Sequence, residues 1–533
     1  METTHNRFKN KNSTSDTPET KESSRMNEPK NKQFHYVSLS LAETILYWVM
    51  WLGTVAYMMY ILVVLSNKHK DELYPGDFSK GWKIIGREKD SSDMEWEFWS
   101  SLKLEFVSSL AIHSIGGFII SYFIPEFKAL FYLVYTLVFL VYLLGILPVV
   151  YMLVHLCIMY LASLTQSVLA VWGVALSILA SLQMDDIRNW QHNYLTNDSQ
   201  HKDLTLFISL MSLLRSISFC LDHCSHKKNT EEKEPASSYS FFNLLSYNFY
   251  LPLFNNGPVM TFDTFYKEFY QPPRPLTKEE ILSLIWDSLR TLWWYICFEA
   301  YLHYVYSSAI VREPPVFMGL SNWSLAALFY SQLHIFLTKY VVLYQLSRIF
   351  ARLDRLDPPQ IPRCVSSLYT FTDMWRYFDR GLNIWMKRYI YLPMGGSRKG
   401  VFRQLLGSLL AFGFVWAWHG GNPDTLWWFI PNWLGVAVEG IAQNIAMSPL
   451  IKRVEEHLSL HMRRRIRAAL CTVTLSGLIL SNMVFLIGPR PVTIFVRRVF
   501  YEGFPASSLV CLTCLYFSIQ TSIDLNNYKG GQW

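Results

Sequence analysis

The sequence predicts an all-α protein that crosses a membrane about ten to twelve times. Of its 533 residues, 51% are hydrophobic and only 17% are charged. A soluble chain of this length would usually divide into several domains joined by polar linkers. Here no long polar linker interrupts the chain after residue 36, and long apolar runs follow one another instead. Residues 37–533 are therefore expected to form one membrane-embedded core.

The first 36 residues differ from everything that follows. They are rich in Asn, Lys, Ser, Thr and Glu and have almost no large apolar residues. Such a composition cannot bury a core, so 1–36 is predicted to be a disordered polar tail. The apolar run at 41–65 is too long and starts too late for a cleavable signal, so it is expected to stay as a span.

The apolar runs give the expected spans in order along the chain. The region 131–182 is mostly apolar, which is enough for two spans at about 20 residues each. Hydropathy indicates further membrane-crossing or re-entrant segments at 104–125, 204–222, 283–310, 323–349, 401–418, 425–447, 467–488 and 505–523.

The net charge of +7 does not indicate nucleic-acid binding, because Lys and Arg lie mostly in short loops between the apolar runs. That distribution is how membrane proteins set their orientation. The most basic stretches, 387–403 and 461–470, are predicted to face the cytosol.

The eight cysteines form no disulfide-rich pattern. Cys511 and Cys514 lie within an apolar run and are interpreted as packing residues. The stretch "CLDHCSH" (220–226) offers several zinc ligands, but it lacks the distant second half that a closed tetrahedral site needs. An acyl chain attached to a juxtamembrane Cys224 is the preferred interpretation.

Two polar stretches interrupt the apolar pattern. In "YNFYLPLFNNGPVMTFDTF" (247–265), prolines, asparagines and a glycine break any helix. This is either a simple turn between helices or a re-entrant loop that lines a tunnel, since non-helical backbone at membrane depth must be buried or line a cavity. In 356–396, three prolines at 358–362 predict an extended lead-in.

An amphipathic helix is expected from about Ser366 onward. At 100° per residue, Asp379 falls at the border between its polar and apolar faces, three residues after Arg376. That spacing predicts an Arg376–Asp379 ion pair. The helix is either an interfacial one with a surface ion pair, or Asp379 is retained at an apolar edge because it is used.

In "FGFVWAWHGGNPDTLWWF" (412–429), a single histidine ends an apolar segment and two glycines follow it. His419 is either an interfacial helix-end residue or a functional group, the default hypothesis for an ionisable residue at membrane depth. Gly420 and Gly421 would leave room for a substrate backbone to approach.

Several of these motifs together resemble the membrane-bound O-acyltransferases, and within them the Hedgehog acyltransferases in an invertebrate-like version. The resemblance covers nearly the whole chain after the tail and rests on "YLPLFNNGP", "DPPQIPRC", "MWRYFDRGLNIWMKRYIYLPMGGS", "WAWHGG", "NWLGVAVEG" and "LSNMVFL". It implies catalytic roles for His419 and Asp379, and a haem b whose iron is held by Cys364. Because relatives that lack the histidine are inactive, its presence here implies an active enzyme. The positions assigned to acyl-coenzyme A are Trp375, Arg376 and Asn482.

The activity that the resemblance implies is transfer of palmitoyl from palmitoyl-CoA to the N-terminal cysteine amine of Hedgehog proteins. A multi-pass monomer in the membrane of the endoplasmic reticulum or Golgi is expected, surrounded by membrane lipids. The free amine has a pKa near 7.7–8.0, so a base must take its proton. Imidazole suits that role, and Asp379 would orient the amine or the histidine. The residues leave open which of the two takes the proton.

As a helix, 401–418 would rise about 27 Å, close to the thickness of a bilayer core. The basic stretch could then meet cytosolic coenzyme A at one end while His419 meets a luminal peptide at the other, unless the segment bends back. Two alternatives remain: a related membrane acyltransferase that acts on a lipid or another secreted protein, and a transporter. A transporter would predict inverted repeats, which are not evident in the sequence.

Overall fold

The computed structural model describes residues 37–196, 199–226, 236–254, 256–272 and 274–528, and these ranges are mostly helical. Within them the strands form one short antiparallel ladder, in which β1 (Phe78–Ser79) pairs with β2 (Lys89–Asp90). The all-α prediction is therefore confirmed. The predicted polar tail, 1–36, lies outside the described residues.

Nine helices in the described ranges are long and apolar enough to cross a membrane. They are α1 (Leu41–His69), α3 (Lys103–Phe123), α4 (Lys128–Leu144), α5 (Ile146–Leu164), α8 (Ser199–His226), α15 (Asn322–Leu353), α18 (Val401–Trp418), α21 (Leu460–Ile487) and α23 (Ala506–Tyr528). Two bent pairs pass the same test together: α6 (Val168–Gln183) with α7 (Asp185–Leu195), and α19 (Pro423–Ala446) with α20 (Pro449–Glu456). Counting each pair as one span gives up to eleven, so the chain is a multi-pass membrane protein.

Two predicted spans differ from the structure. The region 131–182 holds parts of three helices rather than two, because Gly145 and Ser167 interrupt it. Gly145 has a φ of 88°, which stops α4, and the Ser167 hydroxyl caps the first turn of α6. The predicted span 283–310 corresponds to α12 (Lys278–Tyr304), which is not among the nine apolar helices.

Charged residues on α12 explain that second difference. Asp287 of α12 accepts a hydrogen bond of 2.6 Å from Arg352 of α15, and Glu299 lies 3.5 Å from the Lys89 ammonium. These polar contacts attach α12 to its neighbours, and they lower the hydropathy that a sequence window measures.

Shorter helices join the long ones. They are α2 (Met94–Ser101), α9 (Phe241–Asn248), α10 (Leu251–Phe254), α11 (Phe262–Phe269), α13 (Ser307–Arg312), α14 (Pro314–Gly319), α16 (Phe371–Tyr377), α17 (Arg380–Met386) and α22 (Pro489–Val496). α17 continues into a π-helical turn, η7 (Lys387–Tyr391), and α22 into another, η9 (Arg497–Glu502).

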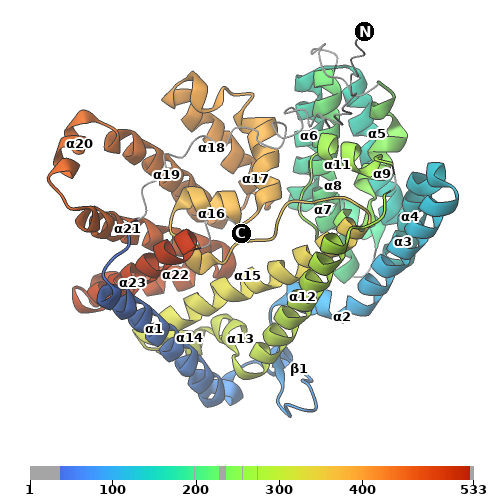
Figure 1. The fold of residues 1–533 in the computed structure, drawn as a ribbon. Helices are drawn as coiled ribbons and strands as arrows, with labels where there is room; N and C mark the ends of the chain where they lie inside the picture. The colour runs from blue at the N-terminus through green and yellow to red at the C-terminus, as the bar shows by residue number, and fades with distance from the viewer. Residues whose placement is uncertain (1–36, 197–198, 227–235, 255, 273, 529–533) are drawn as a thin grey trace, which may run out of the picture.

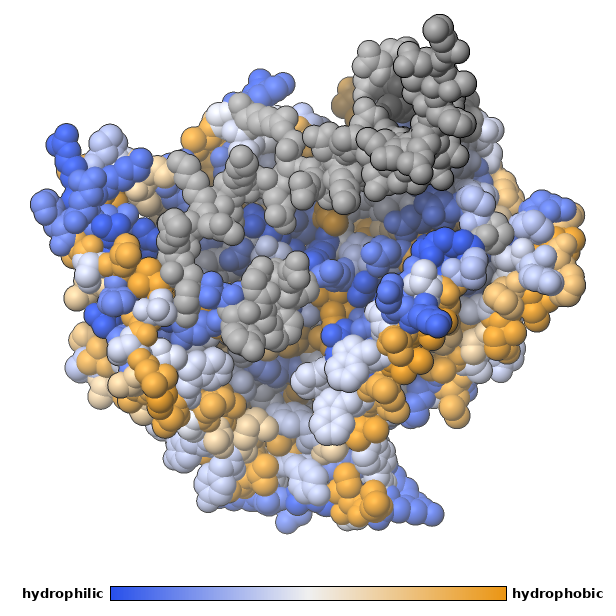
Figure 2. Space-filling view, in the orientation of Figure 1, coloured by the Kyte–Doolittle hydropathy of each residue, from blue (hydrophilic) through white to orange (hydrophobic). Residues whose placement is uncertain are grey.

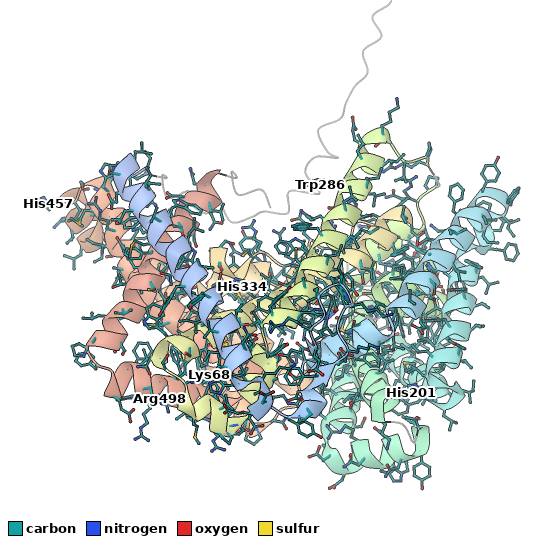
Figure 3. The ribbon with its side chains drawn as sticks, turned by 90° about the horizontal axis from the view of Figure 1, so that it is seen from below. Lys68, His201, Trp286, His334, His457 and Arg498 are labelled. Carbon is teal, nitrogen blue, oxygen red and sulfur yellow. The ribbon has the colours of Figure 1, made fainter. Side chains whose placement is uncertain are left out.

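Figure 1 shows α15 running through the middle of the molecule, with α3 to α6 and α8 on one side and α16, α19, α21 to α23 and α1 on the other. His334 of α15 lies near the centre of the view in Figure 3. In Figure 2, apolar residues gather along the lower and right flanks, over α1 and over α3 and α4. Exposed apolar flanks are what a bilayer requires of the helices that face it.

The most buried span is α8, in which 89% of the apolar window is buried inside the protein. Arg215, near the middle of this helix, is itself buried and donates hydrogen bonds to the backbone carbonyls of Leu253 and Phe254. The guanidinium thereby satisfies two carbonyls where the neighbouring chain is not continuously helical.

That neighbouring chain is the broken stretch 247–265. It folds into α9, α10 and α11 with non-helical links, and residues 256–262 are all buried by surrounding protein, while Asn255 lies outside the described residues. The Ser218 hydroxyl accepts a hydrogen bond from the Phe262 amide at 2.9 Å. The stretch is thus a protein-buried loop rather than an exposed turn. Its lining of a tunnel stays a prediction.

The prediction that Cys224 carries an acyl chain is wrong, because Cys224 is buried in the main hydrophobic core with 1% of its surface exposed. Its neighbour His223 stacks on Tyr239 with ring centroids 5.1 Å apart. The described residues contain no group of three or more His, Cys, Asp or Glu side chains that could hold a metal ion.

Candidate active site

His419 is the residue on which α18 ends. Gly420 and Gly421 follow it with φ values of 108° and 63°. The Gly420 amide donates to the Ala417 carbonyl, and the Gly421 amide donates to the Trp416 carbonyl. This is the Schellman arrangement, in which left-handed backbone closes a helix C-terminus. The cap of the helix therefore explains both glycines without a substrate. The room that they would leave for a substrate stays a prediction.

Long-range contacts fix the helix end that carries this histidine. Gln183 of α6 donates a hydrogen bond of 2.7 Å to the Trp418 carbonyl, and the Trp418 indole donates one of 3.2 Å to the Leu210 carbonyl of α8. The residue just before His419 is thus held by α6 and α8, which fixes the backbone position from which the imidazole extends.

Aromatic rings surround the His419 side chain. The ring of Phe485 lies 4.9 Å from the imidazole centroid, that of Trp418 lies 4.7 Å away and that of Trp428 lies 6.0 Å away, all in edge-on geometry. Burial among them lowers the pKa of His419 to about 4, because a charged imidazolium loses its hydration. The imidazole is therefore neutral at neutral pH and able to accept a proton.

Asp379 does not lie inside a continuous helix. The helix predicted from Ser366 is divided into η6 (Val365–Ser367), α16 and α17, and Asp379 is the extended residue that caps α17, with φ −121° and ψ 91°. Its carboxylate accepts hydrogen bonds from the Leu382 amide at 2.9 Å and from the Tyr344 hydroxyl at 3.0 Å. Burial raises the pKa of Asp379, while these donors oppose that rise by stabilising the anion.

The predicted Arg376–Asp379 ion pair is wrong. Arg376 pairs with Asp373 instead, with 3.8 Å between Nη1 and Oδ1. The reason is the break after α16: residues three apart face each other only while the backbone stays helical, and the chain leaves the helix before it reaches Asp379.

Trp375 and Asn482, both predicted to contact acyl-coenzyme A, meet at Trp428 beside His419. The rings of Trp375 and Trp428 lie 5.5 Å apart, and the Trp428 indole donates a hydrogen bond of 3.4 Å to Oδ1 of Asn482. The structure thus gathers three of the sequence-predicted residues around one tryptophan that was not singled out. Their contact with a substrate stays a prediction.

The motif "NWLGVAVEG" on α19 holds α16 in place. Asn432 accepts a hydrogen bond of 3.2 Å from the Trp375 indole. The Glu439 carboxylate accepts from the amides of Phe371 and Thr372 at 2.6 and 2.9 Å, which caps the start of α16. At Gly435, a Cβ would lie 2.5 Å from the Phe371 ring, so this position needs glycine.

The buried loop supports the other side of the same segment. A Cβ on Gly381, two residues after Asp379, would lie 2.3 Å from the carbonyl oxygen of Val259. The loop and the start of α17 therefore pack backbone to backbone, a contact that only glycine permits. Asp379 is thus held by α15 through Tyr344 and by this loop through Gly381.

Asp379 and His419 lie beside different rings of the same aromatic cluster. Phe485, beside His419, contacts Phe336 at 6.4 Å between centroids, and Phe336 stacks on Phe378, next to Asp379, at 5.4 Å. In the described residues no hydrogen bond joins the His419 and Asp379 side chains directly. A group that bridges them would have to come from a substrate or from water.

Positive charge gathers on the Tyr377 ring, next to this cluster. The guanidinium carbon of Arg363 lies 3.7 Å from the ring centroid, that of Arg380 lies 5.2 Å away and that of Arg376 lies 5.8 Å away. Three guanidinium groups around one ring favour an anionic ligand such as a phosphate.

Within the predicted basic stretch 387–403, Arg388 has a structural role. It bridges Asp222 of α8 at 2.9 Å and Asp263 of α11 at 2.7 Å. Lys387, Lys399 and Arg403 are exposed and remain available to a ligand.

Cys364, the predicted haem ligand, lies in the extended segment before η6 with its side chain exposed. That segment is tied to α15, where His334 Nε2 and Ser366 Oγ lie 2.9 Å apart, and to α23, where Ser522 donates to the Ser366 carbonyl at 2.7 Å. The loop that carries Cys364 is therefore well anchored.

The sequence did not single out Tyr344, Trp428, Phe485 or Gly381. Trp428 and Phe485 do stand inside quoted motifs, so their place in those motifs was an available signal. Tyr344 had none, because it lies within an ordinary apolar helix and meets Asp379 only through the fold.

The chain matches the membrane-bound O-acyltransferase family over residues 154–481. It is similar to Protein-cysteine N-palmitoyltransferase HHAT of Mus musculus, with 31% identity over 86% of this chain and 92% of that protein. It is 30% identical to the HHAT-like protein of Mus musculus, over 91% of this chain and 94% of that one. Identity to Protein-cysteine N-palmitoyltransferase Rasp of Drosophila melanogaster is 25%, over 87% and 93% of the two chains.

Proposed function

Because the chain belongs to the membrane-bound O-acyltransferase family and is an acyltransferase, we propose that it transfers palmitoyl from palmitoyl-CoA to the N-terminal cysteine amine of Hedgehog signalling proteins. The names of the mouse HHAT protein and of Rasp support a protein cysteine as the acceptor. The invertebrate-like character and the Hedgehog acceptor are part of this proposal.

The observation that carries the proposal is the position of His419. It stands at one end of α18, while the exposed Lys399 precedes the other end, about 27 Å away along the helix. A neutral imidazole in an aromatic pocket at the far end of a span from a basic stretch suits a reaction between a cytosolic acyl-CoA and a luminal amine.

In this reaction the amine nitrogen attacks the thioester carbonyl carbon. A C–N bond forms, the C–S bond breaks, coenzyme A leaves as its thiolate, and the proton of the amine must be removed. His419 would accept that proton as general base. Asp379 would attract or orient the amine through a charge-assisted hydrogen bond, and its raised pKa also makes it a candidate acceptor. The pKa of His419 is lowered and that of Asp379 is raised. Either side chain therefore remains a candidate for accepting the proton of the amine.

The acyl donor would lie along the segment that carries Trp375. The Trp375 ring and Asn482 would contact the acyl thioester beside His419, and Arg376, with the other guanidinium groups on Tyr377, would bind the phosphates of coenzyme A. The exposed Lys387, Lys399 and Arg403 would add to this attraction.

A haem b held by Cys364 is the second part of the proposal. The exposed thiol beside Arg363 fits a thiolate ligand, because a neighbouring cation favours the deprotonated form. When bound, haem would brace the proline-rich loop against α15 and α23, since acyl transfer needs no electron.

The enzyme is proposed to act as a monomer in the membrane of the endoplasmic reticulum or Golgi, where a secreted acceptor is accessible. The test is an acylation assay with purified protein, palmitoyl-CoA and a peptide that begins with the Hedgehog N-terminal cysteine. Amide-linked palmitoyl on that peptide, but not on a peptide with an acetylated N-terminus, is expected. Transfer only to a lipid alcohol would replace the acceptor with a lipid, and substrate transport without transfer would support a transporter instead.

A further inference from the structure

A cavity of about 290 Å³ lies away from the candidate active site. It is walled by α1, α15, α21, α23 and the α22–η9 turn, and its lining is mostly aromatic and aliphatic, including Trp51, Phe329 and Phe495. Neither His419, Asp379 nor Cys364 lines it. We call it the α1–α23 cavity.

The cavity is elongated. Its lining follows α15 from Asn322 to Leu333, which is about 16 Å of helix. α1 runs antiparallel beside it: Trp51 contacts Tyr330 at 6.1 Å between ring centroids, and further along α1, Tyr57 contacts Trp323 at 5.7 Å. A narrow space between helices that run along one another fits a linear ligand better than a compact one.

One end of the cavity opens onto the outer surface of membrane-spanning helices. Trp323 and Val510, which both line it, are 37% and 47% exposed on α15 and α23. At the same end, Asn322 donates a hydrogen bond of 3.1 Å to Ser507, which gives this opening a polar edge. Because α15 and α23 are both long and apolar enough to span a membrane, this opening would face the bilayer.

Water is a poor occupant of such a space. A buried water needs two to four polar partners, and two of the hydroxyls on the wall already donate within their own helices. Thr54 donates to the Met50 carbonyl at 2.8 Å, and Ser476 donates to the Thr472 carbonyl at 2.8 Å. An empty cavity of this size would leave its lining without dispersion contacts. Hydrocarbon is the occupant that the walls and the bilayer together favour.

We propose that the α1–α23 cavity binds one acyl chain of a membrane phospholipid, which enters between Trp323 and Val510. The polar end of the lipid stays outside, near the Asn322–Ser507 edge. This site does not depend on the proposed acyl-transfer reaction, because it shares no lining residue with His419 or Asp379.

A bound chain would also steady the active site. Leu333 of α15 lines the cavity, and Phe336, one turn later, belongs to the aromatic cluster. On α21, Leu480 lines the cavity, and Asn482 and Phe485 follow it next to Trp428. Filling the cavity therefore supports the two helices that carry these residues.

The test uses the full chain in nanodiscs that contain a phosphatidylcholine with a photoreactive group in one acyl chain. After irradiation, labelled peptides are identified by mass spectrometry. Labels on the cavity faces of α15 and α23 are expected in the wild type. Val510→Trp, which blocks the exposed opening, should lower that labelling at least tenfold, whereas Val473→Trp, the same change at a more exposed valine of α21 outside the cavity, should leave it unchanged.

A second pair of variants fills the cavity from within. Ala326→Phe should lower labelling and Ala442→Phe, at an exposed position on α19, should not. Equal labelling of wild type and both blocked variants would overturn the proposal. Displacement of the label by excess palmitoyl-CoA would make the cavity an acyl-donor tunnel, and a haem band that depends on Cys511 would make it a haem pocket; either result would also overturn it.

Discussion

The Tyr344 hydroxyl of α15 donates a hydrogen bond of 3.0 Å to Oδ2 of Asp379, the residue that caps α17. Together with the Leu382 amide, it fixes the direction of a buried carboxylate. The neighbouring Tyr340 donates to Glu95 instead, also at 3.0 Å. The two tyrosines lie one helical turn apart, and each donates a hydrogen bond to a carboxylate. Comparing a Phe substitution at each position therefore separates the effect of losing a hydroxyl from the effect of misplacing Asp379.

Tyr344→Phe should lower the rate of transfer tenfold to a hundredfold, because a hydrogen bond to a charged group contributes about 1.5–3 kcal/mol. Tyr340→Phe is the matched control and should leave the rate nearly unchanged at a similar melting temperature. Steady-state transfer and thermal unfolding of both variants make the comparison. Equal rates in the two variants would show that Tyr344 does not position Asp379.

Asp379→Asn should lower turnover about a hundredfold, or about 2.7 kcal/mol in the barrier. Asn keeps the shape of the side chain but loses the charge that attracts an ammonium or orients an imidazole. Asp373→Asn, which removes the exposed partner of Arg376, should cost under about 1 kcal/mol of stability and little activity. If turnover of Asp379→Asn fell only as far as its stability does, Asp379 would be a structural residue.

His419→Ala should abolish transfer while the protein stays folded and still binds palmitoyl-CoA. The reason is that the Schellman turn and the contacts of Trp418 hold this helix end without the imidazole. Turnover and acyl-CoA binding are the two measurements, and near wild-type turnover would exclude His419 as the base.

The dependence of kcat/KM on pH gives a second test of His419 as the general base. With its pKa lowered to about 4, His419 is deprotonated throughout pH 6–9, so its own ionisation does not limit the rate there. kcat/KM should instead rise with the free amine of the peptide, with a midpoint near 7.7–8.0. A midpoint near 6.5 would show that His419 titrates as an ordinary histidine during catalysis.

Gly381→Ala should destabilise the protein by at least about 1–3 kcal/mol, because the new methyl group would overlap the Val259 carbonyl. Gly413→Ala, in α18 with nothing within 4 Å of its Cβ, is the control and should be neutral or stabilising by up to about 1 kcal/mol. Thermal unfolding in detergent measures both. Similar stability of the two variants would contradict the close packing of the buried loop against α17.

Purified protein should show a haem Soret band, and Cys364→Ala should lose it. Cys297→Ala changes a partly buried thiol on α12, far along the chain from the loop, and should keep the band. Soret absorbance and iron content are the measurements. A full band in Cys364→Ala would move the ligand to another residue.

Hydropathy was enough to predict most of the spans and the end of α18, because both depend on local composition. The glycine pair after His419 is a local signal as well, since left-handed backbone favours glycine wherever it occurs. The position of Asp379 could not be predicted in this way. A helical wheel assumes an unbroken helix, and the break before Asp379 is stabilised by distant partners: Tyr344, 35 residues earlier, and Glu439, which caps α16 from 67 or 68 residues later.

The same limit explains Cys224 and α12. Cys224 resembles a juxtamembrane cysteine in the sequence, yet α8 is enclosed by other helices, so its thiol is buried. The charges of α12 meet partners on α15 and near β2, which no window along α12 could show. Long-range contacts decided both of these cases, whereas the division of 131–182 into three helices followed from the local signals of Gly145 and Ser167.

Arg215 has a consequence for how this chain is made. An arginine at the centre of a span costs about 2.5–3.5 kcal/mol at insertion, so α8 enters the bilayer less favourably than a fully apolar helix would. Its carbonyl partner Phe254 is synthesised 39 residues later. At ordinary elongation rates, the Arg215 guanidinium is without this partner for about 2–8 s. A deletion of Leu253 and Phe254, which removes these carbonyls, would therefore show first as degraded nascent chains rather than as a slower enzyme.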